Sequence, residues 1–272
     1  MEMIEMLTIV LSWNRPNLLE KTIESYFRTV SVPHRLIVVD NASNDETVYC
    51  LKKLSKQYNF KAVFLEKNLG GLAFNHILKT VNLEDVKFVH FSENDIEYRK
   101  NWDKELLQKF DTFPKVGQLS PYSPFPEVEK GEVWGIKPAQ FVQKGAQKIY
   151  LSLTNVGTTS IVRKELIKQG LRWENVGDKE FCCPADSKFS KQVRELGYAV
   201  AWNDRYLASN LGHNITEFQR ELDYYIKNYQ SKNKKRNTFN TFQKRLEKQG
   251  YNLMKQKDGR YIISKNINDR NN

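Results

Sequence analysis

Two short apolar runs near the start of the chain predict buried strands. Residues 6–12 read MLTIVLS and residues 35–40 read RLIVVD. Runs that are apolar without alternation are typical of parallel strands covered on both faces. Between them, apolar side chains recur at helical spacing after Pro16, a residue that suits the first turn of a helix. The pattern predicts a strand, a helix and a second strand.

The same alternation continues along the first third of the chain. We expect a helix over 46–58, a strand over 61–65, a helix over 72–81 and a strand over 86–92. Strands and helices that alternate at this length predict an α/β domain with a mixed, mainly parallel sheet between helices.

The later part of the chain is less regular. Prolines and glycines over 118–149 predict loops or a short hairpin. The elements expected beyond it are an extended segment over 151–162, helices over 164–170 and 185–196, a strand over 198–202, and helices over 217–230 and 239–248.

Polar residues follow four of the expected strands. They lie at positions 12–15, 40–43, 66–68 and 93–95. The carboxyl ends of parallel strands meet at one edge of a sheet, where ligands bind, so these segments predict one site. Glu93 and Asp95 alternate along an extended strand end and would share a side, where they could hold a hard divalent cation and the phosphates that it bridges.

Charge is concentrated at the end of the chain. Residues 214–272 contain fourteen Lys and Arg and six Asp and Glu, which gives +8 of the total net charge of +11. A basic segment favours polyanions, such as nucleic acid or an anionic membrane surface, although a solvated helical surface would have the same composition.

Composition excludes several classes of protein. With 40% apolar residues the chain can bury a large core, and three cysteines, two of them adjacent, indicate neither a disulfide framework nor a zinc site. No run has a secretory signal's pattern or the roughly 20 apolar residues that cross a bilayer. We expect a cytoplasmic protein, or one bound peripherally at the inner face of a membrane.

Five phrases carry a family resemblance: LTIVLSWNRPNLLEKTIES, LIVVDNASNDET, VFLEKNLGGLAFN, FVHFSENDIEY and ADSKFSKQVRELGY. In this order and spacing they resemble inverting nucleotide-sugar glycosyltransferases of the GT-A fold, family 2. The resemblance implies a Rossmann-like GT-A catalytic domain over 1–212, with a nucleotide-sugar half at 1–98 and an acceptor half at 99–212. A basic, mostly helical extension would occupy 213–272.

The resemblance also implies a nucleotide-sugar site. Asp40 would accept a hydrogen bond from a uracil-type base, and it could instead cap the turn that follows. The other residues implied are Ser12, Arg15, Asn68, Gly70, Glu93 and Asn94. Glycine in KNLGG would let the backbone approach the ligand, and an ordinary glycine turn is the alternative.

A metal site is implied at the end of the fourth strand. Asp95 matches the second position of the family's D-x-D motif and would bind Mn²⁺ or Mg²⁺, while Glu93 departs from the first and would face the ribose or a metal-bound water. His213 would complete the metal shell, unless it is a surface or structural histidine.

Asp186 aligns with the family's catalytic aspartate and would be the base that takes the acceptor's proton. The residue before it is Ala185 where the family has an acid, and Asp186 could instead be a helix N-cap. Glu174 and Asp178 are the backup candidates. Trp173 is the preferred acceptor contact, with Trp134 and Trp202 as alternatives and Glu174 beside it.

The expected activity is metal-dependent, inverting transfer of a sugar from a nucleoside diphosphate to an acceptor hydroxyl. UDP is the expected carrier, ahead of dTDP and GDP, and the acceptor would be a glycan, lipid-linked or polymeric. The alternatives are a glycosyltransferase with a nucleic-acid acceptor and a non-catalytic module that binds nucleic acid or another polyanion. A nucleotidyltransferase is disfavoured because LSWNRPN contains no glycine-rich phosphate loop.

Overall fold

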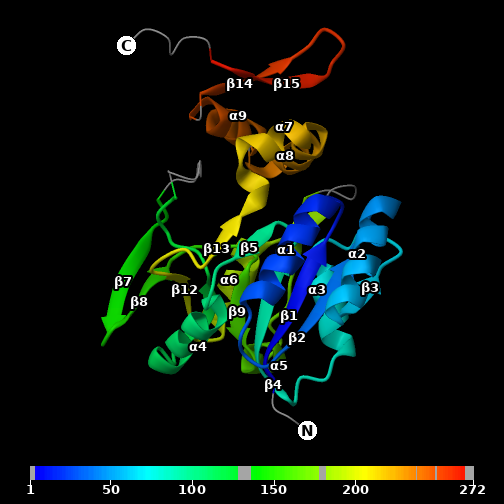
Figure 1. The fold of residues 1–272 in the computed structure, drawn as a ribbon. Helices are drawn as coiled ribbons and strands as arrows, with labels where there is room; N and C mark the ends of the chain where they lie inside the picture. The colour runs from blue at the N-terminus through cyan, green and yellow to red at the C-terminus, as the bar shows by residue number, and fades with distance from the viewer. Residues whose placement is uncertain (1–3, 128–135, 178–181, 237, 249, 267–272) are drawn as a thin grey trace. The chain divides into compact units, whose positions relative to one another are not determined.

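The computed structural model describes residues 4–127, 136–177, 182–236, 238–248 and 250–266 (Figure 1). The chain divides into two compact units. The first, here called the sheet unit, contains residues 1–124, 137–175 and 183–210. The second, here called the C-terminal unit, contains residues 125–136, 176–182 and 211–272.

Within the described residues, the sheet unit is built on a nine-stranded sheet in the order β3-β2-β1-β4-β9-β6-β12-β8-β7. Its strands are β1 (Ile4–Ser12), β2 (His34–Asp40), β3 (Lys61–Phe64), β4 (Val86–Glu93), β6 (Val116–Ser120), β7 (Ala139–Lys144), β8 (Gln147–Ser152), β9 (Ser160–Arg163) and β12 (Ala199–Asn203). The four strands from β3 to β4 are parallel, and β9 runs antiparallel between β4 and β6.

Helices cover both faces of this sheet and produce two separate cores. The helices are α1 (Pro16–Thr29), α2 (Asp45–Tyr58), α3 (Leu72–Thr80), α4 (Trp102–Thr112), α5 (Lys164–Lys168) and α6 (Asp186–Glu195). One core joins α1, α2 and α4 to one face, and the other joins α3, α5 and α6 to the opposite face. Along β1, Met6 and Val10 enter the first core while Leu7 and Ile9 enter the second, as expected of a strand buried on both sides. The expected α/β class is therefore confirmed.

Local sequence explains where the first helices begin. Pro16 occupies the first turn of α1, where its missing N–H costs nothing. The side chain of Asn44 caps α2 by accepting a hydrogen bond from the Thr47 amide at 3.0 Å. Helix α2 ends at Tyr58, and the C-cap residue Asn59 takes a left-handed conformation with φ of 52°.

The segment expected to be extended over 151–162 is instead two strands of different pairing. β8 ends at Ser152, and β9 begins at Ser160. The chain turns between them, with Gly157 at φ of 82°, a conformation that favours glycine. β8 pairs with β7 as a hairpin. The short hairpin expected as one alternative for residues 118–149 is therefore present in the described part of that segment.

Short strand pairs complete the described fold: β5 (Ile96–Tyr98) with β13 (Ala208–Asn210), and β10 (Asn175–Gly177) with β11 (Cys182–Pro184). No helix of the described chain combines the length and the apolar character needed to cross a bilayer.

The C-terminal unit has a small core of its own. It contains the 3₁₀ turn η2 (Leu211–His213), helices α7 (Ile215–Arg220), α8 (Leu222–Arg236) and α9 (Thr238–Lys248), and a hairpin of β14 (Tyr251–Lys255) and β15 (Tyr261–Lys265). Its buried side chains are Phe218, Tyr225, Ile226, Tyr229, Phe242 and Leu246. The sequence pattern predicts mostly helix here, and the hairpin is an additional element that was not predicted. The signal was present, because Asp258-Gly259 lies between two segments of alternating apolar residues.

Candidate functional site

The strand register brings the predicted strand-end residues to one edge of the sheet. Ser12 at the end of β1 pairs with Asp40 at the end of β2, and Leu11 pairs with Glu93 at the end of β4. The three strands therefore end at the same level, and the loops that follow them start side by side.

Asp40 and Ser12 place buried polar atoms at this edge. Asp40 is 1% exposed, and its Oδ2 accepts a hydrogen bond from the Ser43 amide at 3.0 Å. Within the described residues, the buried Oδ1 of Asp40 and the Oγ of Ser12 have no hydrogen-bond partner. Buried polar atoms are almost always paired, so these two atoms suit a polar ligand. The turn-capping role also exists, but it uses only one of the two oxygens of Asp40.

Asn41, which the sequence analysis did not select, holds the loop after β3. Its Nδ2 donates to Asn68 Oδ1 at 2.7 Å, and its Oδ1 accepts from the Leu69 amide at 2.7 Å. The Asn68 oxygen also accepts from the Gly70 amide at 2.8 Å. Asn68 is thus committed to shaping its own loop. The only sequence signal for Asn41 was its place directly after Asp40.

Glycine is required at two positions of this loop for different reasons. Gly70 adopts φ of 56°, in the left-handed region. At Gly71 a Cβ would lie 2.7 Å from the Cα of Pro184, so the loop packs against the backbone that precedes α6. The resemblance implies that Gly70 lets the backbone approach a ligand, and this role stays a prediction. The close neighbour of Gly71 is protein.

The motif after β4 is tied to the loop after β1 by Arg15. Its Nη1 donates to Asp95 Oδ2 at 3.0 Å, and its Nη2 donates to Asn94 Oδ1 at 2.7 Å. Asn94 in turn donates through Nδ2 to the Asn14 carbonyl at 2.8 Å. The side chains of Arg15 and Asp95 are each 9% exposed. Arg15, which was expected beside the nucleotide, uses these two hydrogen bonds to hold Asp95 and Asn94.

Left-handed backbone delivers Arg15 to this position. Asn14 and Arg15 have φ of 53° and 58°, which is uncommon for residues other than glycine. Asn14 is held by its amide, which donates to Ser43 Oγ at 2.9 Å, and by its Oδ1, which accepts from the Asn44 amide at 3.0 Å. Backbone strain of this kind persists where surrounding bonds over-determine it, and it clusters at functional sites.

Asp95 also fits a metal ligand by its own geometry. Among the described residues, nothing hydrogen-bonds to its buried Oδ1. Mg²⁺ and similar ions are commonly held by one or two carboxylates together with substrate phosphates, so one available oxygen is a fitting donor set. In the part of the chain that the structure describes, no group of three or more His, Cys, Asp or Glu could hold a metal. His213 belongs to η2, but its side chain lies outside the described part, so its metal role stays a prediction.

Two tyrosines lie near the acidic motif: Tyr98 is buried, and Tyr122 is partly buried with a buried hydroxyl. Burial, and after it the negative charge of Asp95, raises the pKa of Tyr122 well above its ordinary value. Burial likewise raises the pKa of Tyr98, whose hydroxyl hydrogen-bonds with Ser92. Both phenols are therefore neutral donors or acceptors at physiological pH.

Asp186 is the first residue of α6, and Ala185 occupies the N-cap position without a capping side chain. The N-cap alternative for Asp186 is therefore wrong. Thr158 donates through Oγ1 to Asp186 Oδ1 at 2.7 Å. Because Ser160 pairs with Phe91 of β4, the segment before β9 lies beside the end of β4, and Thr158 holds Asp186 there. Thr158 was not selected from the sequence.

The prediction of a sugar-stacking tryptophan is wrong for Trp173 and Trp202. Trp173 is 1% exposed, and its ring stacks on Phe189 with centroids 3.9 Å apart, so it has no free face for a sugar. Trp202 is also buried. Glu174 is partly exposed and forms an ion pair with Lys188. Trp134 and Asp178 lie outside the described residues.

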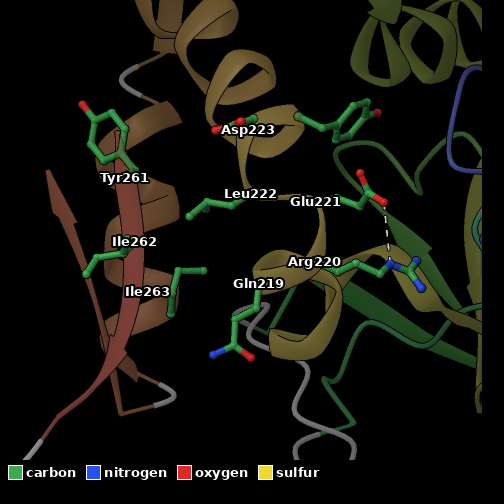
Figure 2. A pocket seen from close by; sticks show the side chains of 9 residues that line it. Gln219, Arg220, Glu221, Leu222, Asp223, Tyr261, Ile262 and Ile263 are labelled. Atoms are coloured by element: carbon green, nitrogen blue, oxygen red, sulfur yellow. Dashed lines mark ion pairs between the residues drawn. The ribbon is translucent and has the colours of Figure 1, made fainter. Parts of the chain in front are cut away.

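A separate cleft of about 550 Å³ lies within the C-terminal unit (Figure 2). Its walls come from α7, α8 and β15, namely Gln219, Arg220, Glu221, Leu222, Asp223, Tyr224, Tyr261, Ile262 and Ile263. Figure 2 shows Arg220 paired with Glu221 on one side. None of the residues predicted for the donor site lines it.

Comparisons with known proteins identify the family. The family model for Glycosyl transferase family 2 matches residues 8–171, which is more than half of the chain. The chain therefore belongs to this family, as its five phrases suggested. A search of curated protein sequences found no significant match.

Solved structures share the fold. A mannosyltransferase from Pyrobaculum calidifontis, PcManGT, in complex with GDP-Man and Mn²⁺, is 16% identical with a TM-score of 0.52 over 74% of this chain and 57% of that chain. S. aureus TarS 1–349 is 18% identical with a TM-score of 0.56 over 82% of this chain and 63% of its own. TarS 1–349 with UDP-GlcNAc has the same identity and TM-score over 75% of this chain and 58% of that chain. The chain thus spans about three fifths of these relatives.

Proposed function

We propose that this protein is a metal-dependent, inverting glycosyltransferase that moves a sugar from a nucleoside diphosphate to an acceptor hydroxyl. The carrying observation is the pair of buried oxygens, Asp40 Oδ1 and Asp95 Oδ1, which have no hydrogen-bond partner among the described residues. In a family 2 chain, Asp40 ends β2 and Asp95 follows the end of β4, and these two strands flank β1 at one edge of the sheet. One would accept from the base, and the other would face the diphosphate's cation.

UDP is the proposed carrier. TarS structures with UDP-GlcNAc and with UDP support this, while the complex of PcManGT with GDP-Man keeps GDP as the nearest competitor. Ser12 and the loop held by Asn41 and Asn68 would complete the nucleotide pocket beside Asp40. Glu93, at the end of β4, would face the ribose or a metal-bound water.

Mn²⁺ or Mg²⁺, when bound, would neutralise the charge that develops on the leaving diphosphate. Asp95 Oδ1 would be the protein's oxygen ligand, with His213 as a second proposed ligand. The Mn²⁺ in the complex of PcManGT supports a divalent cation in this fold.

Asp186 would supply base catalysis. As its carboxylate takes the acceptor hydroxyl's proton, the acceptor oxygen bonds to the anomeric carbon from the face opposite the diphosphate. The bond from that carbon to the diphosphate oxygen breaks, and the configuration inverts. The Thr158 hydrogen bond orients the carboxylate but also lowers its basicity, as does the start of α6. Desolvation by the bound acceptor would offset both effects.

The proposed acceptor is a glycan, lipid-linked or polymeric, and the proposed location is the cytoplasm or the inner face of a membrane. We propose residues 213–272 as an extension to a catalytic domain over 1–212, and this extension would provide the contact with an anionic surface. Met254 and Ile262 face each other across the hairpin and are 45% and 36% exposed, with exposed Lys255 and Lys265 on the same strands. By strand alternation these lysines lie on the opposite face of the hairpin, so the exposed apolar pair would contact lipid, and the net charge of +8 over residues 214–272 would supply the attraction to anionic headgroups.

Release of UDP from a panel of UDP-sugars tests the activity. Wild type with Mn²⁺ and a mixed glycan acceptor pool should release UDP, and Asp186→Asn should not.

Sedimentation with vesicles of phosphatidylglycerol or phosphatidylcholine tests the proposed membrane contact of the hairpin, with Met254→Ser/Ile262→Ser as the variant. Salt-sensitive binding to DNA or RNA in place of vesicles would instead favour the nucleic-acid alternatives.

A further inference from the structure

The ion pair between Arg15 and Asp95 is the feature of the donor site that its proposed chemistry does not use. The pair has 3.0 Å between Nη1 and Oδ2, and both side chains are almost fully buried. At this edge of the sheet, Arg15 therefore balances the charge of the carboxylate proposed to hold the cation. The positive charge of Arg15 also repels a nearby cation, and this repulsion is stronger in a low-dielectric site.

Arg15 is also fixed in place. Its second nitrogen, Nη2, donates to Asn94 Oδ1 at 2.7 Å, and Asn94 donates to the Asn14 carbonyl at 2.8 Å. Arg15 is thus bonded to Asn94, and Asn94 is bonded to the backbone of Asn14, the residue before Arg15. A planar guanidinium can bridge two acceptors in this way, whereas a lysine ammonium is a single point charge.

The two oxygens of Asp95 are consequently unequal. Oδ2 accepts from Arg15, whereas Oδ1 is buried and has no hydrogen-bond partner in the described part of the chain. Asp95 can therefore offer Oδ1 to a cation while Arg15, bound at Oδ2, compensates the negative charge of the carboxylate. Such a site attracts a cation weakly until a further negative group arrives.

We propose that Arg15 makes cation binding at Asp95 conditional on the donor's diphosphate. Arg15 neutralises the charge of Asp95, so this carboxylate attracts Mn²⁺ alone only weakly; the diphosphate would then supply further negative charge and the remaining oxygen ligands. Cation and nucleotide would bind together. This inference rests on the proposed donor site, and it adds a positioning and charge-balancing residue to it.

Electron paramagnetic resonance of free Mn²⁺ tests the proposal without any turnover. Wild type should bind Mn²⁺ weakly alone and at least about tenfold more tightly with UDP. Arg15→Gln should bind Mn²⁺ without UDP at least about tenfold more tightly than wild type, and adding Asp95→Asn should abolish this gain. Arg15→Lys keeps the charge and should stay weak.

Arg15→Met, which keeps the apolar stem, is measured in parallel in case Arg15→Gln does not fold. Arg35→Gln is the matched control, because Arg35 pairs with Asp85 at 2.8 Å at the amino-terminal ends of β2 and β4, opposite the proposed site, and it should leave Mn²⁺ affinity unchanged. The inference is overturned if the neutral Arg15 variants bind Mn²⁺ alone as weakly as wild type. Failure of wild type to bind Mn²⁺ with any nucleotide would instead overturn the proposed donor site.

Discussion

The hydroxyl of Thr158 donates a 2.7 Å hydrogen bond to the carboxylate of Asp186, across 28 residues of sequence. Thr158 lies in the turn before β9, and Asp186 opens α6. The bond fixes the proposed base beside the end of β4, so the position of Asp186 depends on a residue in another element.

Replacing Thr158 tests whether this bond matters to transfer. Thr158→Val keeps the shape but removes the donor, and we expect kcat to fall about tenfold because the carboxylate loses its orientation. The KM for the donor should stay near the wild-type value. Thr158→Ser keeps a hydroxyl and should restore most of kcat; equal loss in both variants would mean that only packing was disturbed.

Asp186→Asn should separate binding from chemistry. The amide keeps the size of the side chain but cannot take a proton, so transfer should fall at least about a hundredfold, in the range seen for general bases. The thermal shift produced by nucleotide and Mn²⁺ should be unchanged. Transfer near the wild-type rate would remove Asp186 as the base and move the role to Glu174 or Asp178.

Gly71→Ala should destabilise the fold by about 1–3 kcal/mol, the usual cost of overpacking. The new methyl would lie 2.7 Å from the Cα of Pro184, and backbone cannot easily move away. Chemical denaturation measures the loss. Leu72→Ala is the adjacent control, because Leu72 is 42% exposed and should change stability far less.

Stability should fall with acid because of His90. Burial lowers the pKa of His90 from 6.5 to about 3, and Thr8 hydrogen-bonds to its Nδ1 at 3.3 Å. The unfolded chain binds a proton below about pH 6.5 while the folded chain does not until about pH 3, so the stabilisation is present above pH 6.5 and is lost as pH falls. By pH 5 the loss from this residue should be about 2 kcal/mol.

Urea denaturation at pH 7 and pH 5 measures this loss. His90→Phe should show a smaller drop between the two pH values than wild type. His76→Gln, which changes an exposed histidine, should show the wild-type drop. An unchanged drop in His90→Phe would assign the acid sensitivity to other groups.

Local patterns were sufficient for the first third of the chain, as far as β4, whereas β5, α4 and β6 were not predicted. The continuous apolar runs predicted β1 and β2 because strands covered on both faces need apolar residues at every position. The polar residues after them predicted one edge because parallel strands end together. Those inferences use only periodicity and strand direction, which a single sequence contains.

The missed residues depend on long-range partners. Thr158 matters because of a bond to Asp186, and Asn41 because it closes the loop around Asn68. Both residue types are common in turns, so the sequence marks Asn41 only by its place after Asp40 and does not mark Thr158. The prediction that Trp173 contacts the acceptor was wrong for a related reason, because the burial of Trp173 depends on Phe74, Phe91 and Phe189 from three separate elements.

The most direct test of the central claim is thermal stabilisation of the full chain by UDP, dTDP and GDP, each with and without Mn²⁺. We predict that one nucleotide, UDP, raises the melting temperature in a Mn²⁺-dependent way, that Asp95→Ala abolishes the rise, and that the control Asp85→Ala retains it. No shift with any nucleotide, or a shift that persists in Asp95→Ala, would contradict a donor site built on Asp95.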